Sequence, residues 1–209
     1  GTFINLPALT YDIKIRDRAA PSCIITLNIA LAVTQPAVLN ASISSSNVTC
    51  FNGNDGSITI SSPSGGSGNY EYSIDGGANW QSSTSFTGLT ASSYNVLIRD
   101  ASSPACIITL NSSLAIDQPA ILDANIATSN VTCFTGNDGS ISITSPSGGS
   151  GNYEFSINGG SDWQSSGSFT SLPAGSYNVV IRDTDTPSCT ITLDPALSIS
   201  QPNGITANV

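Results

Sequence analysis

A tandem repeat constrains this chain more than any other feature of its sequence. Residues 48–58, VTCFNGNDGSI, return with one change as residues 131–141, an offset of 83 positions. The same offset aligns Trp80 with Trp163 and needs no insertion or deletion. A fixed period of this length is typical of an array of small domains, so the 209 residues are not one large domain.

The period divides the sequence into four parts. Residues 1–36 match the second half of a repeat, residues 37–119 and 120–202 are complete repeats, and residues 203–209 match the opening of another. We therefore expect a window on a longer array. Because only a Gln-Pro dipeptide separates the last apolar residue of one repeat from the strand that opens the next, we also expect an extended, stiff rod.

Alternation of apolar and polar residues predicts β-strands. Between residues 11 and 16, apolar side chains occupy every second position. The polar position of Lys14 becomes Leu97 and then Val180, so we expect this variable row to face solvent and the constant apolar row to face the core. About seven short strands per repeat, without helical periodicity, predict an all-β fold of tandem immunoglobulin-like antiparallel β-sandwiches.

The residues expected in the core of the first complete repeat occupy one face of each predicted strand. They are Leu39, Ile43, Ile58, Ile60, Tyr70, Tyr72, Ile74, Phe86, Leu89, Tyr94, Val96, Ile98, Ile108, Leu110, Leu114 and Ile116. Tyr94 and Tyr177 follow a tight corner, written LPAGSY in the last repeat. The corner is similar to the tyrosine corner of immunoglobulin-like domains, in which the hydroxyl bonds the backbone a few residues upstream.

The charge balance excludes several classes of partner. Five basic residues stand against fourteen acidic ones, so the surface repels phosphate backbones and anionic lipids. The surface polarity comes instead from Ser, Thr, Asn and Gly, which suits an extracellular protein. No apolar run approaches the length that crosses a bilayer, so we expect neither nucleic-acid binding nor direct membrane insertion.

Residues for catalysis are missing from the sequence. The chain has no histidine, and therefore no imidazole base or imidazole metal ligand. Glu71 and Glu154 recur at one position, but strand alternation places them on the solvent face. The complete repeats contain no lysine, which excludes Lys–Asn isopeptide crosslinks. We therefore expect no enzyme and no cofactor.

The NGNDG loop at residues 52–56 has a superficial likeness to a calcium loop. It offers one carboxylate and lacks the downstream bidentate glutamate that such a loop needs. We favour a turn in which Asn54 and Asp55 accept backbone N–H bonds and the glycines adopt positive φ. The weaker alternative is a cation held by Asn54 and Asp55, and by Asn137 and Asp138 in the next repeat.

Two further side-chain types recur once per repeat. Trp80 and Trp163 are candidate platforms for a sugar ring, but we favour a structural role in which each packs over the edge of its own sandwich. Arg16, Arg99 and Arg182 each precede an aspartate at the end of a strand. This spacing predicts a local ion pair on a solvated face, worth at most about 1 kcal/mol.

Several ordered motifs carry a resemblance to a known family. The elements TCFxGNDGSI, SGGSGNY, SIxGGxxWQSS, LxAxSYNV and Gln-Pro follow one another in both complete repeats. In this order they resemble the SprB-type repeat of the large gliding-motility adhesins of Bacteroidota. The resemblance implies export by type IX secretion, display as filaments on the bacterial cell surface, and adhesion to substrata. It carries over no catalytic residue.

The five cysteines recur at fixed places in the repeat, as disulfide partners do in an oxidising compartment. Pairing within a repeat joins Cys50 to Cys106 and Cys133 to Cys189, and leaves Cys23 alone. Pairing across the boundary joins Cys50 to Cys189. A third pattern, Cys23 with Cys50 and Cys106 with Cys133, spans nearly two domain lengths and is rejected. We favour pairing within each repeat, which lets every repeat fold as an oxidised unit.

Together these features predict a non-enzymatic structural and adhesive segment of a long cell-surface filament, of the gliding-motility type through the resemblance. The expected partners are neighbouring repeats of the same polypeptide and, through regions outside this sequence, the cell-surface motility machinery. The alternative is a carbohydrate-binding module that contacts surface polysaccharide or another substratum through Trp80, Trp163 and the Ser/Asn-rich loops.

Overall fold

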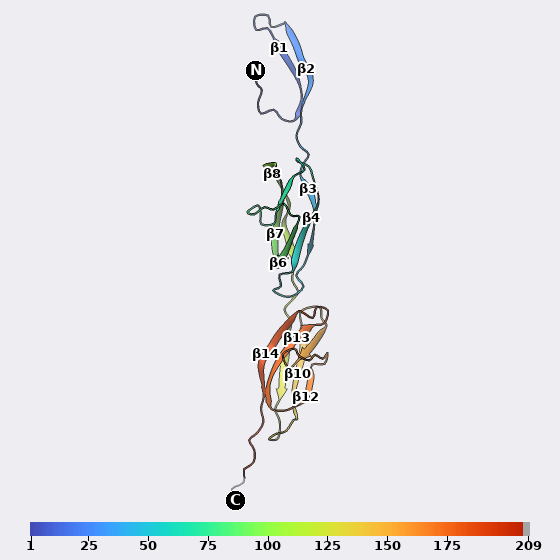
Figure 1. Cartoon of the computed structure of the whole chain (residues 1–209), viewed down its shortest axis with the longest axis vertical. Helices are drawn as coiled ribbons and strands as arrows, with labels where there is room; N and C mark the ends of the chain where they lie inside the picture. The colour runs from blue at the N-terminus through green and yellow to red at the C-terminus, as the bar shows by residue number, and fades with distance from the viewer. Residues whose placement is uncertain (207–209) are drawn as a thin grey trace.

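The computed structural model describes residues 1–206, and within that range it contains strands and no helix (Figure 1). The strands of the N-terminal hairpin are β1 (Leu9–Arg16) and β2 (Ile24–Val33). Those of the first complete repeat are β3 (Asn40–Ser46), β4 (Gly56–Ser64), β5 (Tyr70–Ser73), β6 (Ser85–Leu89), β7 (Ser92–Asp100) and β8 (Ser103–Ile116). Those of the second are β9 (Asp123–Ser129), β10 (Gly139–Ser147), β11 (Tyr153–Ser156), β12 (Ser168–Leu172), β13 (Gly175–Asp183) and β14 (Thr190–Ile199).

Each complete repeat is a sandwich of two antiparallel sheets. In the first repeat the strand orders are β3-β4-β6 and β5-β7-β8, and in the second they are β9-β10-β12 and β11-β13-β14. Six strands therefore replace the seven that the sequence predicted. The remaining segment forms only an isolated bridge, in which Tyr72 and Gln81 exchange two backbone hydrogen bonds. The immunoglobulin-like fold class is confirmed.

The core of the first repeat lies between its two sheets. Leu39, Ile58 and Ile60 from one sheet meet Tyr72 and three aliphatic residues from the other. The predicted core residues are buried or pack against this cluster, except Ile108, which is 37% exposed. The sequence reading also missed a core residue, Val48 at 3% exposure, because it lies outside the strands.

The prediction that the row of Leu97 and Val180 faces solvent is wrong. The two side chains are only 8% and 6% exposed. The cause is the segment 75–81, which lies across the outer face of β7. The N–H of Gly76 in this segment donates to the Asn95 carbonyl, and the ring of Trp80 stacks on Arg99. Asn95 and Arg99 are the two positions that flank Leu97 on that face. A strand whose outer face is covered by a loop tolerates apolar residues on both faces.

The N-terminal hairpin repeats the last two strands of a sandwich. Its register, with Tyr11 opposite Leu31, is that of β13 and β14, where Tyr177 lies opposite Leu197. The packing differs, because Ile15 in the hairpin is 54% exposed. Its counterpart in β13 is fully buried. The local sequence thus suffices for the strand pairing, while burial requires a facing sheet.

The tyrosine corner is present in all three copies. The hydroxyls of Tyr11, Tyr94 and Tyr177 donate to backbone carbonyls four residues upstream, at 2.8, 2.9 and 2.8 Å. Each ring is held at the turn that begins the strand. This contact ties the chain entering β7 or β13 to the loop before it, as the sequence predicted.

We expect Tyr94→Phe and Tyr177→Phe each to lower the free energy of unfolding by about 1 kcal/mol, because each removes one hydrogen bond of the corner. Urea or thermal unfolding measures this. Tyr72→Phe is the matched control, because Phe155 occupies the equivalent buried position in the next repeat. Unfolding curves for the corner variants that superimpose on the wild-type curve would contradict a stabilising role.

Candidate functional site: the junction between the repeats

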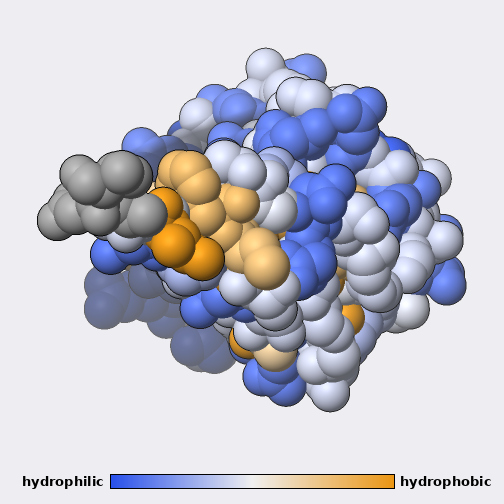
Figure 2. Space-filling model, turned by 90° about the horizontal axis from the view of Figure 1, so that it is seen from below, coloured by the Kyte–Doolittle hydropathy of each residue, from blue (hydrophilic) through white to orange (hydrophobic). Residues whose placement is uncertain are grey.

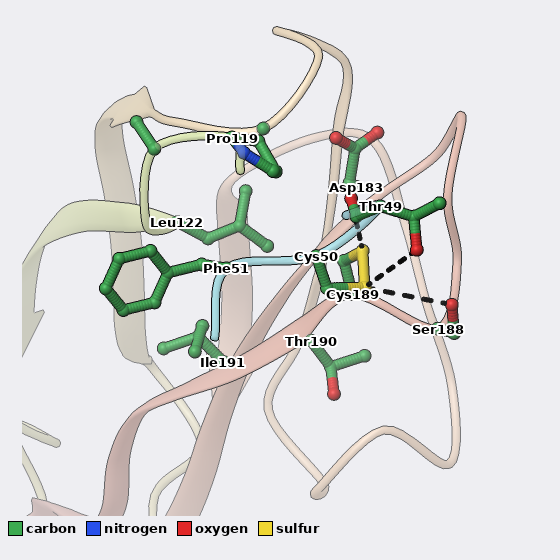
Figure 3. A pocket seen from close by; sticks show the side chains of 12 residues that line it. Thr49, Cys50, Phe51, Pro119, Leu122, Asp183, Ser188, Cys189, Thr190 and Ile191 are labelled. Carbon is green, nitrogen blue, oxygen red and sulfur yellow. Dashed lines mark hydrogen bonds between the residues drawn. A yellow bond between two sulfur atoms is a disulfide. The ribbon is translucent and has the colours of Figure 1, made fainter. Parts of the chain in front are cut away.

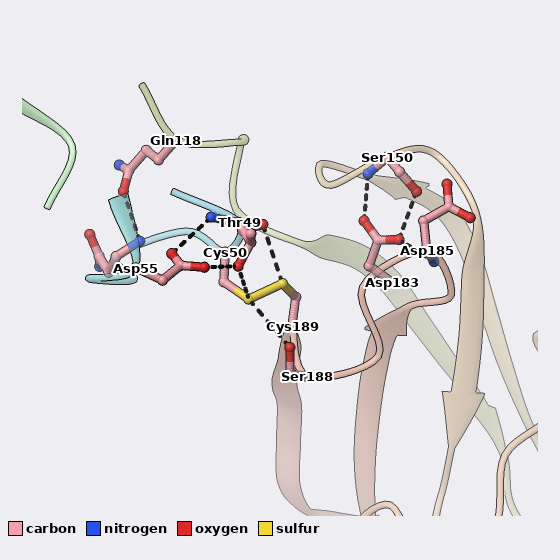
Figure 4. Close-up of a disulfide and its surroundings, with 10 residues drawn as sticks. Thr49, Cys50, Asp55, Gln118, Ser150, Asp183, Asp185, Ser188 and Cys189 are labelled. Carbon is pink, nitrogen blue, oxygen red and sulfur yellow. Dashed lines mark hydrogen bonds between the residues drawn. A yellow bond between two sulfur atoms is a disulfide. The ribbon is translucent and has the colours of Figure 1, made fainter. Parts of the chain in front are cut away.

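A disulfide joins the two complete repeats. Cys50 lies in the loop that follows β3, at the end of the first sandwich that faces the second (Figure 4). Cys189 directly precedes β14, at the near end of the second sandwich. Their Cα atoms are 5.3 Å apart, and the bond links residues 139 positions apart in sequence. The Cys189 sulfur also lies 3.4 Å from the Thr49 carbonyl oxygen.

The favoured pairing within each repeat is therefore wrong. Within one sandwich, Cys50 follows Val48, whose N–H bonds the Asp117 carbonyl just past the end of β8. Cys106 lies at the other end of the same strand, ten residues from Ile116, which is about 33 Å at 3.3 Å per residue. A disulfide needs Cα atoms within about 7 Å. The boundary-spanning alternative, which the sequence left open, is the one observed.

The cysteines outside this bond occupy equivalent places. Within residues 1–206, Cys23, Cys106 and Cys133 form no disulfide and are exposed. Cys133 follows β9 as Cys50 follows β3, and Cys106 stands in the first repeat where Cys189 stands in the second. Each complete repeat therefore carries one cysteine at each of its ends.

The disulfide lies beside an apolar contact between the sandwiches. In Figure 3 the Phe51 ring lies between the side chains of Leu122 and Ile191 of the second repeat, and Pro119 of the connecting segment lines the same cavity. These residues line a cavity of about 210 Å³ at the junction. Ile191 is the counterpart of Ile108, so the mispredicted exposure of Ile108 has a simple reason. The phenylalanine that lines the same cavity as Ile191 comes from the preceding repeat.

The loop that carries Cys50 is held by side chains rather than by a strand. Both carboxylate oxygens of Asp55 accept from Thr49, one from its N–H at 3.0 Å and one from its hydroxyl. These bonds, the hydroxyl first, lower the pKa of Asp55. Gln118, of the Gln-Pro dipeptide, accepts the Asn52 N–H at 2.8 Å. The NGNDG loop is thus a turn that aims Cys50 at the next repeat.

The glycines of this loop serve a different purpose from the one predicted. Positive φ occurs at Asn52 (57°), and at Thr135 (61°) in the second repeat, rather than at the glycines. A Cβ on Gly53 would lie 2.7 Å from a Val48 methyl, and one on Gly56 would lie 2.8 Å from Ile116. The glycines are required because the loop packs directly on the sandwich core.

Asp100 and Asp183 organise the opposite end of each sandwich. Asp100 is 4% exposed and accepts from the Ser67 N–H and hydroxyl, both at 2.6 Å. The Ser67 hydroxyl is the main reason that the pKa of Asp100 is lowered. Burial raises the pKa of Asp183, but the bonds from Ser150 and the following backbone outweigh it, so the net pKa is lowered. Gly66 must be glycine here, with φ +55° and a Cβ position 2.6 Å from the Asp100 carboxylate.

The predicted pairing of each arginine with the following aspartate is wrong for Arg99 and Arg182. Arg99 instead bonds Glu71 on the neighbouring strand, with Nη2 at 2.7 Å, and Arg182 bonds Glu154 in the same way. The aspartates turn toward the serine loops, where backbone donors are available. Glu71 and Glu154 are therefore half-buried ion-pair partners on the outer face of their sheets.

The tryptophans lie over these ion pairs. The Arg99 guanidinium carbon is 4.3 Å from the centre of the Trp80 ring, and Arg182 and Trp163 repeat this distance. The Trp80 Nε1–H donates to the Gly77 carbonyl at 2.9 Å. A cation already stacked on the indole occupies a face that a sugar would need. This geometry counts against the carbohydrate-platform alternative.

In the hairpin before each tryptophan, an aspartate and an asparagine have exchanged positions between the two repeats. Asp75 accepts from the Asn79 side chain at 2.7 Å. In the second repeat Asn158 replaces the aspartate and Asp162 replaces the asparagine, and the amide donates to the carboxylate at the same 2.7 Å. In the first repeat the Asn79 N–H and the Ser73 hydroxyl also point at Asp75, and with the Asn79 side chain they lower its pKa to about 2.

The far end of the second repeat presents the equivalent loop without a following sandwich. Figure 2 views this end and shows apolar residues gathered beside the chain end. Among the exposed apolar residues of the described chain are Phe134, at 54%, and Ile205. Phe51, the counterpart of Phe134, is 36% exposed beside the second repeat.

Within 1–206 no group of three or more His, Cys, Asp or Glu side chains is placed to hold a metal ion. In the weaker cation alternative, Asn54 with Asp55 and Asn137 with Asp138, the one carboxylate of each loop accepts hydrogen bonds from the preceding threonine. The described chain also has no helix able to span a bilayer.

Peptide mapping without reductant tests the junction. We expect one crosslinked species that contains Cys50 and Cys189, with Cys23, Cys106 and Cys133 open to alkylation because they are exposed and unpaired in the described chain. A crosslink between the Cys50 and Cys106 peptides would overturn the assigned connectivity. Mapping after reduction is the control for complete recovery of all peptides.

Acid unfolding tests the Asp75 hairpin. Its folded pKa of about 2 lies below the model-compound value of 3.8, so its stabilisation is present above pH 3.8 and is lost as the pH falls toward 2. The matched control is the double variant Asp75→Asn/Asn79→Asp, which gives the first repeat the residues of the second. We expect the variant to lose less stability than the wild type between pH 4 and about pH 2 in urea unfolding. Identical acid profiles would contradict this assignment.

A comparison with protein families agrees with the sequence pattern. The sequence profile described as "SprB repeat" matches residues 42–79 and 125–162. No curated protein matches the chain. Among solved structures it is similar to one titled "Three N-terminal domains of the bacteriophage RB49 Highly Immunogenic Outer Capsid protein (Hoc)", with 16% identity and a TM-score of 0.41. That match covers 78% of this chain and 59% of the other, so the chain spans less than two thirds of the capsid protein fragment.

The two profile matches fall on the periodic part of the structure. Each begins within the first strand of a complete repeat and ends one residue before the tryptophan. They are offset by the same 83 positions as the sequence repeat. The chain therefore contains two tandem segments that match the SprB repeat, as the resemblance predicted.

Proposed function

We propose that this chain is a non-enzymatic structural and adhesive segment of a long bacterial cell-surface filament, of the kind used as a gliding-motility adhesin. The observation that carries the proposal is the junction. Two SprB repeats are joined by the Gln118-Pro119 segment and by the Cys50–Cys189 disulfide. A disulfide placed between domains, rather than within one, serves to fix their relative position.

Three further features support an extracellular, structural role. Disulfides persist in oxidising compartments outside the cytosol. The acidic surface, with a formal charge of −9, keeps a repetitive β protein soluble and discourages lateral association. The recurrent carboxylates at Asp55, Asp100 and Glu71 are engaged by neighbouring side chains or backbone, which is the use expected of structural polar groups.

The proposed units are residues 37–119 and 120–202, followed by the opening of a further repeat at 203–209, with the 1–36 hairpin as the end of a preceding one. In this proposal the adjoining repeats of the polypeptide are the immediate partners. Type IX secretion and contact with the motility machinery belong to regions outside this sequence.

Small-angle X-ray scattering tests the stiff-segment proposal. At about 40 Å per sandwich we expect a maximum dimension of about 100 Å and a rod-like scattering profile. A compact globule of this length would have a radius of gyration near ~17 Å. The Cys50→Ser/Cys189→Ser double variant should show a broader distance distribution, and Cys133→Ser should match the wild type. Scattering from freely jointed units in the oxidised wild type would contradict the proposal.

A further inference from the structure

The Cys50–Cys189 bond changes the covalent path between the two ends of the repeat pair. The backbone enters the first sandwich beside Pro36 and runs through β3 to Cys50 at the junction. It leaves the second sandwich through β14, which begins one residue after Cys189. The bond therefore connects the first strand of one repeat directly to the last strand of the next.

We propose that this disulfide is a tension bypass, which carries axial pulling force past the 138 residues between the two cysteines. Residues 37–50 and 189–203 form the shortest covalent route through both sandwiches. The route uses β3 and β14 and leaves out the other ten strands of the two repeats, β4 through β13. The inference rests on the proposed function only in taking pulling along the chain as the load that the protein meets.

In the folded state the covalent route through β3, the disulfide and β14 is already close to its fully extended length. Strands are already extended at about 3.3 Å per residue, close to the chain's limit of about 3.3–3.6 Å. β3 and β14 each run from one end of their sandwich to the other. Asn40 pairs with Ser64 near the entry, whereas Val48 bonds Asp117 at the exit. Little length is gained before the route through β3, the disulfide and β14 takes the force.

Force on this route does not separate the sheets. A pull on β3 enters at residue 37 and leaves at Cys50, so the strand is loaded at both of its ends and is not drawn past β4. The same holds for β14 between Cys189 and residue 203. Without the bond, force enters each repeat on its first strand and leaves on its last, so it shears strands of opposite sheets past each other. Unfolding then releases the length stored in β4 to β8 or in β9 to β13.

The two cysteine positions that form this bond recur in both complete repeats. Cys133 follows β9 and Cys106 lies near the start of β8, the same positions relative to their sandwiches as Cys50 and Cys189. A bond within a repeat would bypass only the strands between the first and last strands of its own sandwich, and it would carry no force across the junction to the neighbouring repeat.

Single-molecule force extension of the whole chain, with handles at its two termini, tests the bypass. At about 3.5 Å per residue, the fully stretched oxidised chain should reach about 250 Å and the reduced chain about 730 Å. The difference, about 480 Å, is the length of the 138 residues between the cysteines. Cys50→Ser/Cys189→Ser should behave as the reduced chain without any reductant. Cys106→Ser/Cys133→Ser, which changes the equivalent cysteines, should behave as the oxidised wild type.

Equal final lengths for the oxidised and reduced wild type would overturn the bypass. Comparing one protein in two redox states keeps the test valid if the serine variant folds poorly. The outcome is also separable from the proposed function. Scattering from a flexible chain, together with a short final length under force, would contradict the rod and support the bypass. Rod-like scattering together with the full stretched length would support the rod and contradict the bypass.

Discussion

Each sandwich depends on burial of one face of each of two small sheets. The side chains at its centre, such as Ile58, Val96 and Ile98, are fully enclosed, but the fully buried set is short for a unit of this length. Small domains bury a low fraction of their surface, so the apolar core alone leaves a narrow margin of stability. The loops must therefore be stabilised by other means.

Those means are hydrogen bonds from short polar side chains to nearby backbone. Asp55 holds the junction loop, Asp100 holds the serine–glycine loop, and Ser73 and Asp75 hold the tryptophan hairpin. All are local in space and none needs a long flexible side chain, so little conformational entropy is lost when they form. The abundance of Ser, Asn, Asp and Gly in the sequence reflects this use of the loops. The junction adds one covalent link to a scaffold that is otherwise held by many weak bonds.

The fold could be predicted because its determinants recur. Period-two alternation identified most strands, and the repeat offset showed which positions stay apolar. The prediction of which residues are buried failed where burial depends on a loop or on a neighbouring repeat that covers the strand. Leu97 is covered by the tryptophan segment. Ile108 differs from its counterpart Ile191, which lines the junction cavity together with Phe51 of the preceding repeat. Alternation describes one strand and carries no information about what crosses it.

The site was harder to predict because it depends on which sandwich ends meet. Sequence spacing identified the cysteines but not their partners, since pairing depends on whether Cys106 or Cys189 lies at the end where Cys50 emerges. The backbone bond from Val48 to Asp117, just past the end of β8, decides this, because Cys106 lies at the other end of that strand. Similarly, Arg99 lies next to Asp100 in sequence, but strand geometry directs the two side chains to opposite faces. Glu71, on the adjacent strand, then becomes the nearest carboxylate on the arginine's side.

The stacked arginines have a consequence for resistance to proteases. Arg99 and Arg182 are the only basic residues after residue 36. Proteases that cleave after arginine or lysine must bind that side chain in a pocket and draw the chain around it into an extended, unpaired form. Here each arginine is stacked on a tryptophan and paired with a glutamate, on a strand bonded to neighbours on both sides. The two complete repeats thus offer trypsin-like enzymes no accessible cleavage site while they remain folded.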